Sequence, residues 1–187
     1  MATISSFKAQ MQGGGARPNQ FRVELTFPAF IGSIASSAGS ASAFLCRSAS
    51  LPGSTMEDIT ANYRGRPVHF AGERTFQPWT VGMYNDTDFL MRKVFEKWHN
   101  GVLNYDSTQG ILAPKDYQVD MSVYQLDRND KVLKTYKFFD AYPTNVTQIQ
   151  LAFDSNNAIE EFDVEFTYNY FTTCLLYTSP SPRDATL

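Results

Sequence analysis

The residues of this sequence that are able to act as nucleophiles, bases or metal ligands are few and widely separated. His69 and His99 lie 30 residues apart, and neither has a second His or Cys at the spacing of a metal site. Cys46 lies in an alternating segment, where a small buried apolar role is commoner than a nucleophilic one. The sequence contains no GxSxG, P-loop or GxGxxG motif. We therefore expect no enzyme activity, no metal site and no cofactor.

One short acidic motif, Asp86-Thr87-Asp88, is open to two interpretations. Two carboxylates at this spacing are able to hold a divalent ion. Asp86 also precedes a stripe of apolar residues at helical spacing, where a carboxylate accepts an orphan amide hydrogen and complements the helix dipole. We favour the helix cap, because it explains the motif without an ion. His99, near the other end of this helix, is expected to hydrogen-bond the last carbonyls.

The apolar stripe after Asp86 predicts a single clear helix that ends near Asn100-Gly101. Charged residues fall on the other faces of this helix. We expect the stripe to pack the helix onto the core through Phe89, Phe95 and Trp98.

Acidic and apolar residues alternate along the last predicted strand, residues 162–170. Phe162, Val164, Phe166, Tyr168 and Tyr170 share one face, and the opposite face carries Glu161, Asp163 and Glu165. Asp116 and Asp120 repeat the acidic pattern on another predicted strand. Such a face is ordinarily exposed to solvent. The alternative is a surface facing something that must not bind, and the spacing alone does not decide between the two.

Most of the remaining sequence is typical of short antiparallel strands. Alternation and turn residues predict strands at 20–27, 43–51, 55–70, 74–84, 117–123, 131–139 and 146–153. Segment 55–70 is expected to be a hairpin that turns at Tyr63, Arg64, Gly65 and Arg66, with Gly65 at positive φ. Pro78 is expected at a bulge or an edge. Residues 32–42, almost all Gly, Ala and Ser, predict a loop. The fold class is mainly β: two packed antiparallel sheets, sandwich or barrel-like, with one flanking α-helix.

Length and composition favour one domain. The chain has 187 residues, with 16 Lys+Arg against 19 Asp+Glu and a net charge of -3. The first 100 residues carry +3 and the rest carry -6. The positive half of one copy is able to attract the negative half of a neighbouring copy. An ordinary solvated surface is the commoner explanation of such a charge distribution. Two cysteines without CxxC spacing and the lack of a signal-like apolar stretch predict a protein of the reducing cytosol. No apolar run approaches ~20 residues, so we expect no membrane insertion.

The two ends of the chain differ from its middle. Residues 1–19 lack periodicity and contain three consecutive glycines, which predicts a flexible N-terminal arm on a domain spanning residues 1–174. Residues 175–187, LLYTSPSPRDATL, continue no earlier pattern and resemble a translated cloning adapter. We expect this tail to be non-native or disordered.

An ordered series of motifs between residues 50 and 102 is far more specific than any of its members. The series runs SLPG, YRGR, AGERTFQPWTV, NDTDF and RKVFEKW, and it is flanked by FRVELTFP near the start and FDVEFTYNYF near the end. In this order the motifs closely resemble the tail tube proteins of T4-like contractile phages. The resemblance covers most of residues 1–174.

This resemblance implies a structural subunit and no catalysis. Six copies of such proteins form a ring in which one sheet from each copy joins a continuous β-barrel. The rings stack helically into a tube inside a contractile sheath, and a polar or negative lumen lets viral DNA pass without specific binding. The implied partners are further copies of the chain, the sheath, the baseplate and the tape-measure protein. The implied location is the virion tail, with assembly in the host cytoplasm.

Under this hypothesis two groups of residues have roles. The candidate lumen-facing residues are Glu161, Asp163, Glu165, Asp116 and Asp120. The hairpin turn at residues 63–66 is a candidate contact with the adjacent ring. Two alternatives remain: the tube of a bacteriocin or other contractile injection device, and a β-sandwich that binds a glycan or small ligand. The latter rests on the 15 Phe, 10 Tyr and 2 Trp of the sequence.

Overall fold

The computed structural model describes residues 3–11 and 15–175 of the chain. The segment 176–187, nearly all of the tail that we expected to be non-native, lies outside the described residues. The strands are β1 (Phe21–Glu24), β2 (Cys46–Ala49), β3 (Ser54–Tyr63), β4 (Arg66–Phe76), β5 (Trp79–Tyr84), β6 (Val119–Leu126), β7 (Val132–Val146), β8 (Glu161–Thr167) and β9 (Tyr170–Leu175). The helices are α1 (Ile4–Gln10), the 3-10 helix η2 (Ala29–Ile31), α2 (Ile34–Leu45), α3 (Leu90–Val102) and α4 (Pro114–Tyr117).

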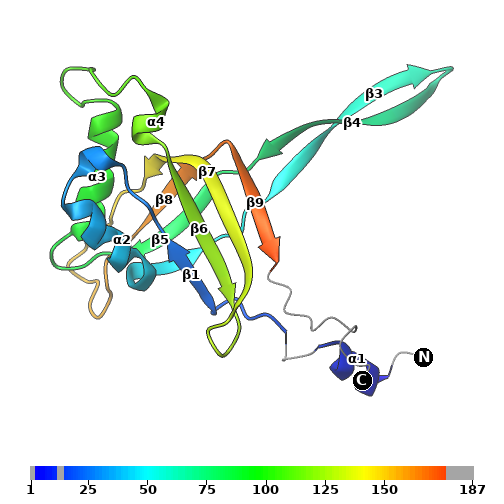
Figure 1. Cartoon of the computed structure of the whole chain (residues 1–187), viewed down its shortest axis with the longest axis horizontal. Helices are drawn as coiled ribbons and strands as arrows, with labels where there is room; N and C mark the ends of the chain where they lie inside the picture. Colours follow the sequence, from blue (N-terminus) through cyan, green and yellow to red (C-terminus); the bar gives the residue numbers. More distant parts are fainter. Residues whose placement is uncertain (1–2, 12–14, 176–187) are drawn as a thin grey trace, which may run out of the picture.

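Two antiparallel sheets share the long strand β7. The first sheet has the order β1-β6-β7-β9, and the second has the order β7-β8-β5-β2. Residues 132–141 of β7 pair with β6, and within them 134–139 also pair with β9. The last residues, 142–146, pair with β8, so one continuous strand passes from sheet to sheet (Figure 1). The predicted mainly β fold with two antiparallel sheets is confirmed.

A backbone bend at Asp140 lets β7 change sheets. Asp140 has a φ of 57°, a conformation that Asp tolerates better than most residues. Asn169, in the short break between β8 and β9, holds this bend. Its side-chain amide donates to Asp140 Oδ2 over 3.0 Å, and its backbone N–H donates to the Phe139 carbonyl over 3.1 Å. Strands that switch sheets ordinarily do so through such bends.

The core lies between the two sheets and α3. Trp79 of β5 stacks on Phe138 of β7 with ring centroids 4.2 Å apart, which joins the sheets by direct aromatic contact. Phe95 of α3 meets Phe162 and Phe166 of β8 edge to face, a favourable arrangement for aromatic pairs. Trp98 is fully buried, and its ring N–H donates to the Tyr117 carbonyl over 3.0 Å. The predicted helix is thus the element that closes one side of the core.

The start of α3 matches the predicted cap in chemistry but not in position. Asp86 Oδ1 accepts a hydrogen bond from the Leu90 N–H over 2.9 Å, as expected of a capping carboxylate. The helix begins only at Leu90, because Phe89 has a φ of 54° and lies outside it. Phe89 is consequently 42% exposed, and only Phe95 and Trp98 of the three predicted packing residues are buried.

Residues 34–42 lie in helix α2, so the loop predicted over 32–42 is wrong. Alanine favours the helix, and small side chains let it approach β1 closely. Ala38 and Ser42 are fully buried, and the Ser42 hydroxyl accepts from the Leu25 N–H over 3.4 Å. The strand predicted over 43–51 is correspondingly reduced to the four residues of β2.

Three other predicted strands end elsewhere. Segment 74–84 is divided at Gln77-Pro78 into the end of β4 and the start of β5. Segment 146–153 contributes only Val146 to a strand, because the ladder between β7 and β8 ends there. The Thr147 N–H still donates to the Asp163 carbonyl over 2.9 Å, but none of the described strands pairs with residues 148–153. Segment 162–170 is two strands separated at residues 168–169. Within the predicted arm, residues 4–10 form the exposed helix α1, which is a further difference.

The β3–β4 hairpin leaves the body as a long two-stranded projection (Figure 1). None of its strand residues is buried. Its two-residue turn has φ of 49° at Arg64 and 80° at Gly65. Positive φ at both central residues matches the right-handed twist of a hairpin. The predicted turn, with Gly65 at positive φ, is confirmed.

Candidate assembly and lumen surfaces

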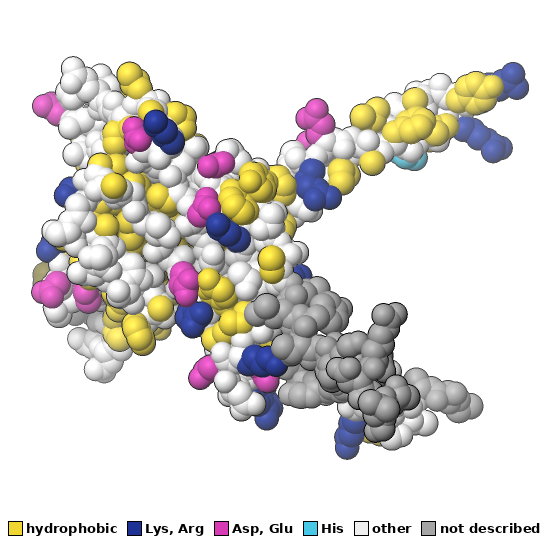
Figure 2. Space-filling model, viewed as in Figure 1, with side chains coloured by type: hydrophobic (Ala, Val, Ile, Leu, Met, Phe, Trp, Pro, Cys, Tyr) yellow, Lys and Arg dark blue, Asp and Glu magenta, His cyan; other side chains and the backbone are white. Residues whose placement is uncertain are grey.

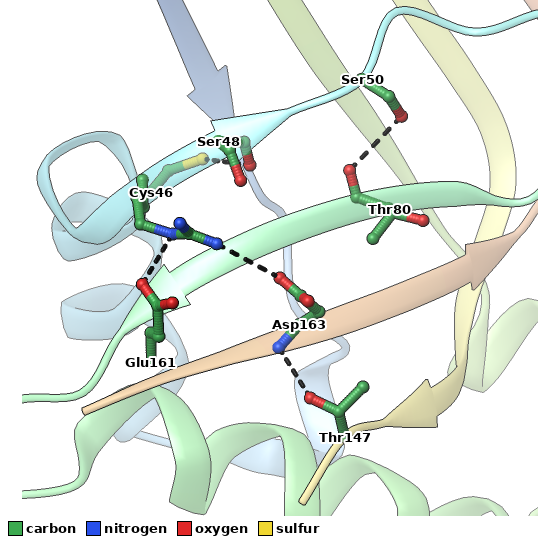
Figure 3. A network of polar contacts seen from close by, with 8 residues as sticks. Cys46, Ser48, Ser50, Thr80, Thr147, Glu161 and Asp163 are labelled. Carbon is green, nitrogen blue, oxygen red and sulfur yellow. Dashed lines mark hydrogen bonds and ion pairs between the residues drawn. The ribbon is translucent and has the colours of Figure 1, made fainter. Parts of the chain in front are cut away.

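Arg47 connects two of the candidate lumen residues across the sheet that contains β8. Its Nε lies 2.9 Å from Glu161 Oε2, and its Nη2 lies 4.0 Å from Asp163 Oδ1. Figure 3 shows Glu161 and Asp163 on the same side of β8, directed toward β2. The three side chains are between 39% and 48% exposed, so water screens these ion pairs. The cluster retains one net negative charge.

Gly82 makes room for this connection. It lies on β5, between β2 and β8, and pairs with Ser48 on one side and Asp163 on the other. A Cβ at this position would lie 2.5 Å from Ser48 Oγ and 2.9 Å from Asp163 Oδ1. The register between β2 and β5 shifts between Cys46 and Ser48, which leaves Arg47 as the bulged residue. Bulges commonly re-aim a side chain in this way.

The remaining acid of the β8 face, Glu165, has a neutral partner, and so does the Asp163 backbone. Glu165 Oε2 accepts from the Asn145 side-chain amide over 3.3 Å. The backbone N–H of Asp163 donates to Thr147 Oγ1 over 2.8 Å, at the end of the β7–β8 ladder (Figure 3). Glu161, Asp163 and Glu165 therefore share one sheet face, as their alternation predicts.

Asp116 and Asp120 lie elsewhere. Asp120 is on β6 in the other sheet, where its carboxylate forms an ion pair with Lys137 Nζ at 2.9 Å. Asp116 is in α4 and not in a strand, because Pro114 at the first helical position starts a short turn of helix there. The five predicted residues thus belong to three separate elements, and only the three on β8 form one surface.

The hairpin has one apolar and one polar face. Cross-strand partners lie on the same face, so the pairings Ile59–Phe70 and Ala61–Val68 give the apolar face, which continues to Tyr63. Ile59, Tyr63 and Phe70 are 56%, 65% and 56% exposed. Hydrophobic side chains follow the hairpin in Figure 2, with basic side chains at its tip.

The opposite face of the hairpin is polar. Asp58 Oδ2 lies 2.6 Å from His69 Nδ1 and accepts from the Thr60 hydroxyl over 3.1 Å. At the tip, the Arg64 guanidinium lies over the Tyr63 ring, 5.4 Å from its centroid. The predicted contact residues Tyr63, Arg64, Gly65 and Arg66 are all exposed at the point farthest from the core.

The reactive side chains have structural roles. Burial raises the pKa of the Cys46 thiol to about 11, which disfavours the nucleophilic thiolate. His99 Nε2 lies 3.1 Å from the Pro143 carbonyl. The prediction that it bonds the last carbonyls of its own helix is therefore wrong. Burial lowers the pKa of His99, with the Pro143 carbonyl opposing that shift and Arg92 adding to it. In the described part of the chain, no three His, Cys, Asp or Glu residues are grouped as metal ligands.

A hollow of about 530 Å³ lies beside the end of α3. His99, Leu103, Tyr105, Tyr142 and Pro143 contribute to its lining. The Tyr105 hydroxyl donates to the Glu96 carbonyl over 3.3 Å. The Tyr105 ring, an aromatic surface on which a sugar is able to stack, is thus attached to α3 by this hydrogen bond. Among the helices described, none combines the length and apolarity needed to cross a bilayer.

Sequence reasoning did not find Arg47 or Gly82. Alternation places side chains on faces, but it does not tell which strands are neighbours. Here β2 and β8 are separated by more than 100 residues in sequence and by one strand in space. The only available signal was Gly82 within an otherwise apolar strand, since an isolated strand glycine often marks a close approach.

The fold is that of the tubes in contractile injection systems. A chain of the extended sheath-tube complex of an extracellular contractile injection system, PVC, has a TM-score of 0.58 and 12% identity, covering 94% of this chain and 100% of its own length. A chain of the anti-feeding prophage cap has a TM-score of 0.62 and 15% identity, covering 86% and 91%.

The sequence comparisons define the family. The sequence model of the phage tail tube protein family matches residues 16–174. Tail tube protein gp19 of Enterobacteria phage T4 is 32% identical over 165 residues, which cover 88% of this chain and 95% of gp19. The tail tube protein of Serratia phage KSP90 is 26% identical over 170 residues, covering 90% and 95%. The chain belongs to the phage tail tube protein family, and the predicted resemblance is confirmed.

Proposed function

We propose that this chain forms hexameric rings that stack into the inner tube of a contractile phage tail, and that viral DNA passes through the lumen into the host. Open sheet edges carry the proposal. Among the described residues, β2 pairs only with β5 and β9 pairs only with β7, so each has an unpaired side. Exposed edges promote uncontrolled pairing, and closing a sheet into a barrel removes them. A ring of copies achieves this closure.

Electron microscopy of the purified chain tests the assembly. We expect rings with six-fold symmetry and tubes made of stacked rings. A chain that stays monomeric at every concentration, even with a tail baseplate present, would overturn the proposal. The tube of a bacteriocin-type device is separated from a phage tail by its gene neighbourhood, since only a phage requires a capsid gene.

We assign the lumen to the face of β8 that carries Glu161, Asp163 and Glu165. Negative charges that line a narrow channel repel phosphates, and DNA is then able to slide instead of binding. Arg47 offsets part of this charge, and Glu165 makes no ion pair with it. Of the three acids, Glu165 would therefore contribute most to the negative potential of the proposed lumen.

Charge reversal at single acids tests which face lines the lumen. Glu165→Lys is expected to give tubes that retain fluorescent duplex DNA in a salt-dependent manner, while wild-type tubes release it. Asp116→Lys on α4 and Asp120→Lys on β6 are the matched controls, and we expect neither to retain DNA. If a control variant retains DNA and Glu165→Lys does not, the lumen assignment to β8 is wrong.

The proposal extends to the partners of the tube. The sheath would surround the assembled rings, and the baseplate and the tape-measure protein would be further partners. Assembly would take place in the host cytoplasm. Co-purification of these proteins with wild-type tubes from infected cells is the direct measurement.

A further inference from the structure

The irregular segment 147–160, between β7 and β8, resembles the hairpin in having exposed apolar side chains. Its charged residues are all acidic. Leu151, Phe153 and Ile159 are 79%, 110% and 68% exposed. The segment contains Asp154 and Glu160 but no Lys or Arg. A shallow hollow of about 480 Å³ lies along it, with Leu151 and Ile159 in its lining. We call residues 147–160 the acidic loop.

The hairpin tip has the complementary properties. Residues 59–72 contain Arg64 and Arg66 but no Asp or Glu, and they carry the exposed apolar face formed by Ile59, Val68 and Phe70. The tip and the acidic loop are thus both apolar, with opposite formal charges of two units. Complementary charge of this kind steers association and fixes register.

The two surfaces are unable to meet within one copy. The hairpin extends from one side of the body, and the acidic loop lies on the opposite side, next to α3 (Figure 1). A contact between them must therefore join two copies head to tail. A heterologous contact that does not close on itself propagates into a filament.

We propose that the tip of the β3–β4 hairpin of one copy docks on the acidic loop of a second copy in the next ring. Arg64 and Arg66 then approach Asp154, and the apolar face of the hairpin covers Leu151, Phe153 and Ile159. Asp154 is the exposed acid of the pair, since the Glu160 carboxylate already accepts from the Asn85 side-chain amide over 2.9 Å. This inference rests on the proposed tube and adds the surface that receives the hairpin.

Charge exchange tests this contact in the full chain. Arg64→Glu combined with Arg66→Glu, or Asp154→Arg alone, should raise the critical concentration for tube growth by about tenfold while rings still form. Combining all three substitutions should restore growth to near the wild-type concentration. Arg128→Glu, in the exposed turn between β6 and β7, is the matched control and should leave growth unchanged.

The outcomes separate this inference from the proposed function. Wild-type protein that forms no tubes contradicts the proposed function itself. Wild-type tubes with an unaffected Arg64→Glu, Arg66→Glu variant overturn only the inference. Rescue of that variant by Asp106→Arg, and not by Asp154→Arg, would move the contact to the loop after α3 and also overturn it.

A cross-link provides a second readout that does not depend on charge. Tyr63→Cys and Phe153→Cys are introduced together in a Cys174→Ser background, because Cys174 is exposed. Mild oxidation of assembled tubes should then give a ladder of covalent oligomers on a denaturing gel. Variants that carry only one of the two introduced cysteines, with Cys46 left in place, should stay monomeric. Intact tubes that give no ladder would count against the contact.

Discussion

The body and the β3–β4 hairpin use apolar residues in opposite ways. In the body, aromatic side chains from two sheets and a helix are fully buried, including Trp79, Phe95 and Phe138. In the hairpin, Ile59 and Phe70 are each 56% exposed on the same face. The body therefore gains its hydrophobic stabilisation within one copy. The hairpin gains such stabilisation only when another surface covers it, at about 25 cal/mol per Å² of apolar area.

Under the proposed function, this sequence encodes the fold and the assembly surface in separate segments. An isolated two-stranded hairpin is marginally stable at best. Its length and its uncovered apolar face are therefore costs that folding alone does not explain. Substitutions in the two regions should consequently separate subunit stability from assembly.

The largest effect is expected in the body. Phe95→Ala or Trp98→Ala should lower the free energy of unfolding by about 3–5 kcal/mol, because each removes a fully buried ring. Phe44→Ala is the matched control, since Phe44 also lies in a helix but is 86% exposed. Urea denaturation of the subunit gives both values. Equal losses at Phe95 and Phe44 would contradict the description of the core.

A smaller effect is expected at the start of α3. Asp86→Ala should lower the free energy of unfolding by about 1 kcal/mol, because the Leu90 N–H loses its carboxylate partner. Asp88→Ala, two residues on, removes a carboxylate outside this cap and should change stability by less than about 0.5 kcal/mol. Thermal unfolding of the two variants under identical conditions makes the comparison, and a larger loss at Asp88 would argue against the cap.

The pH dependence of the body should have a component from His99. Its pKa is lowered in the folded state, chiefly by burial, so the unfolded chain binds more protons as the pH falls below about 6.5. The contribution is fully present above that pH and is lost as the pH falls toward the folded pKa. His99→Gln should flatten the stability curve in this window. Identical pH profiles for wild type and variant would exclude the contribution.

The smallest effect on the subunit is expected in the hairpin. Ile59→Ser combined with Phe70→Ser should change the free energy of unfolding by less than about 0.5 kcal/mol, because neither side chain is buried. The same variant should assemble poorly, which sedimentation of tubes measures. If this variant is strongly destabilised, or if it assembles as well as the wild type, the proposed separation between a stabilising body and an assembling hairpin is wrong.

The features that were predictable from the sequence are those that the local spacing of residue types determines. Alternation locates the acidic and apolar faces of β8, helical spacing locates Phe95 and Trp98, and Gly65 locates the hairpin turn. Faces and turns of this kind depend only on residues near each other in the chain.

Features that depend on distant residues were not predictable in this way. Residues 32–42 show little apolar periodicity, yet all but the first two are helical because small side chains fit closely against β1. Residues 148–153 are strand-like, but none of the described strands pairs with them. Arg47 reaches Asp163 across a position of β5 that a glycine, Gly82, leaves open. In each case the deciding partner is remote in sequence.

The shared strand β7 has a mechanical consequence. Because one backbone runs through both sheets, a load applied to either sheet passes to the other through covalent bonds as well as through side-chain packing. Shearing the sheets apart would require tearing a ladder from β7 or straightening the corner that Asn169 clamps at Asp140. We therefore expect the two sheets to move as one rigid unit when force is applied to the subunit.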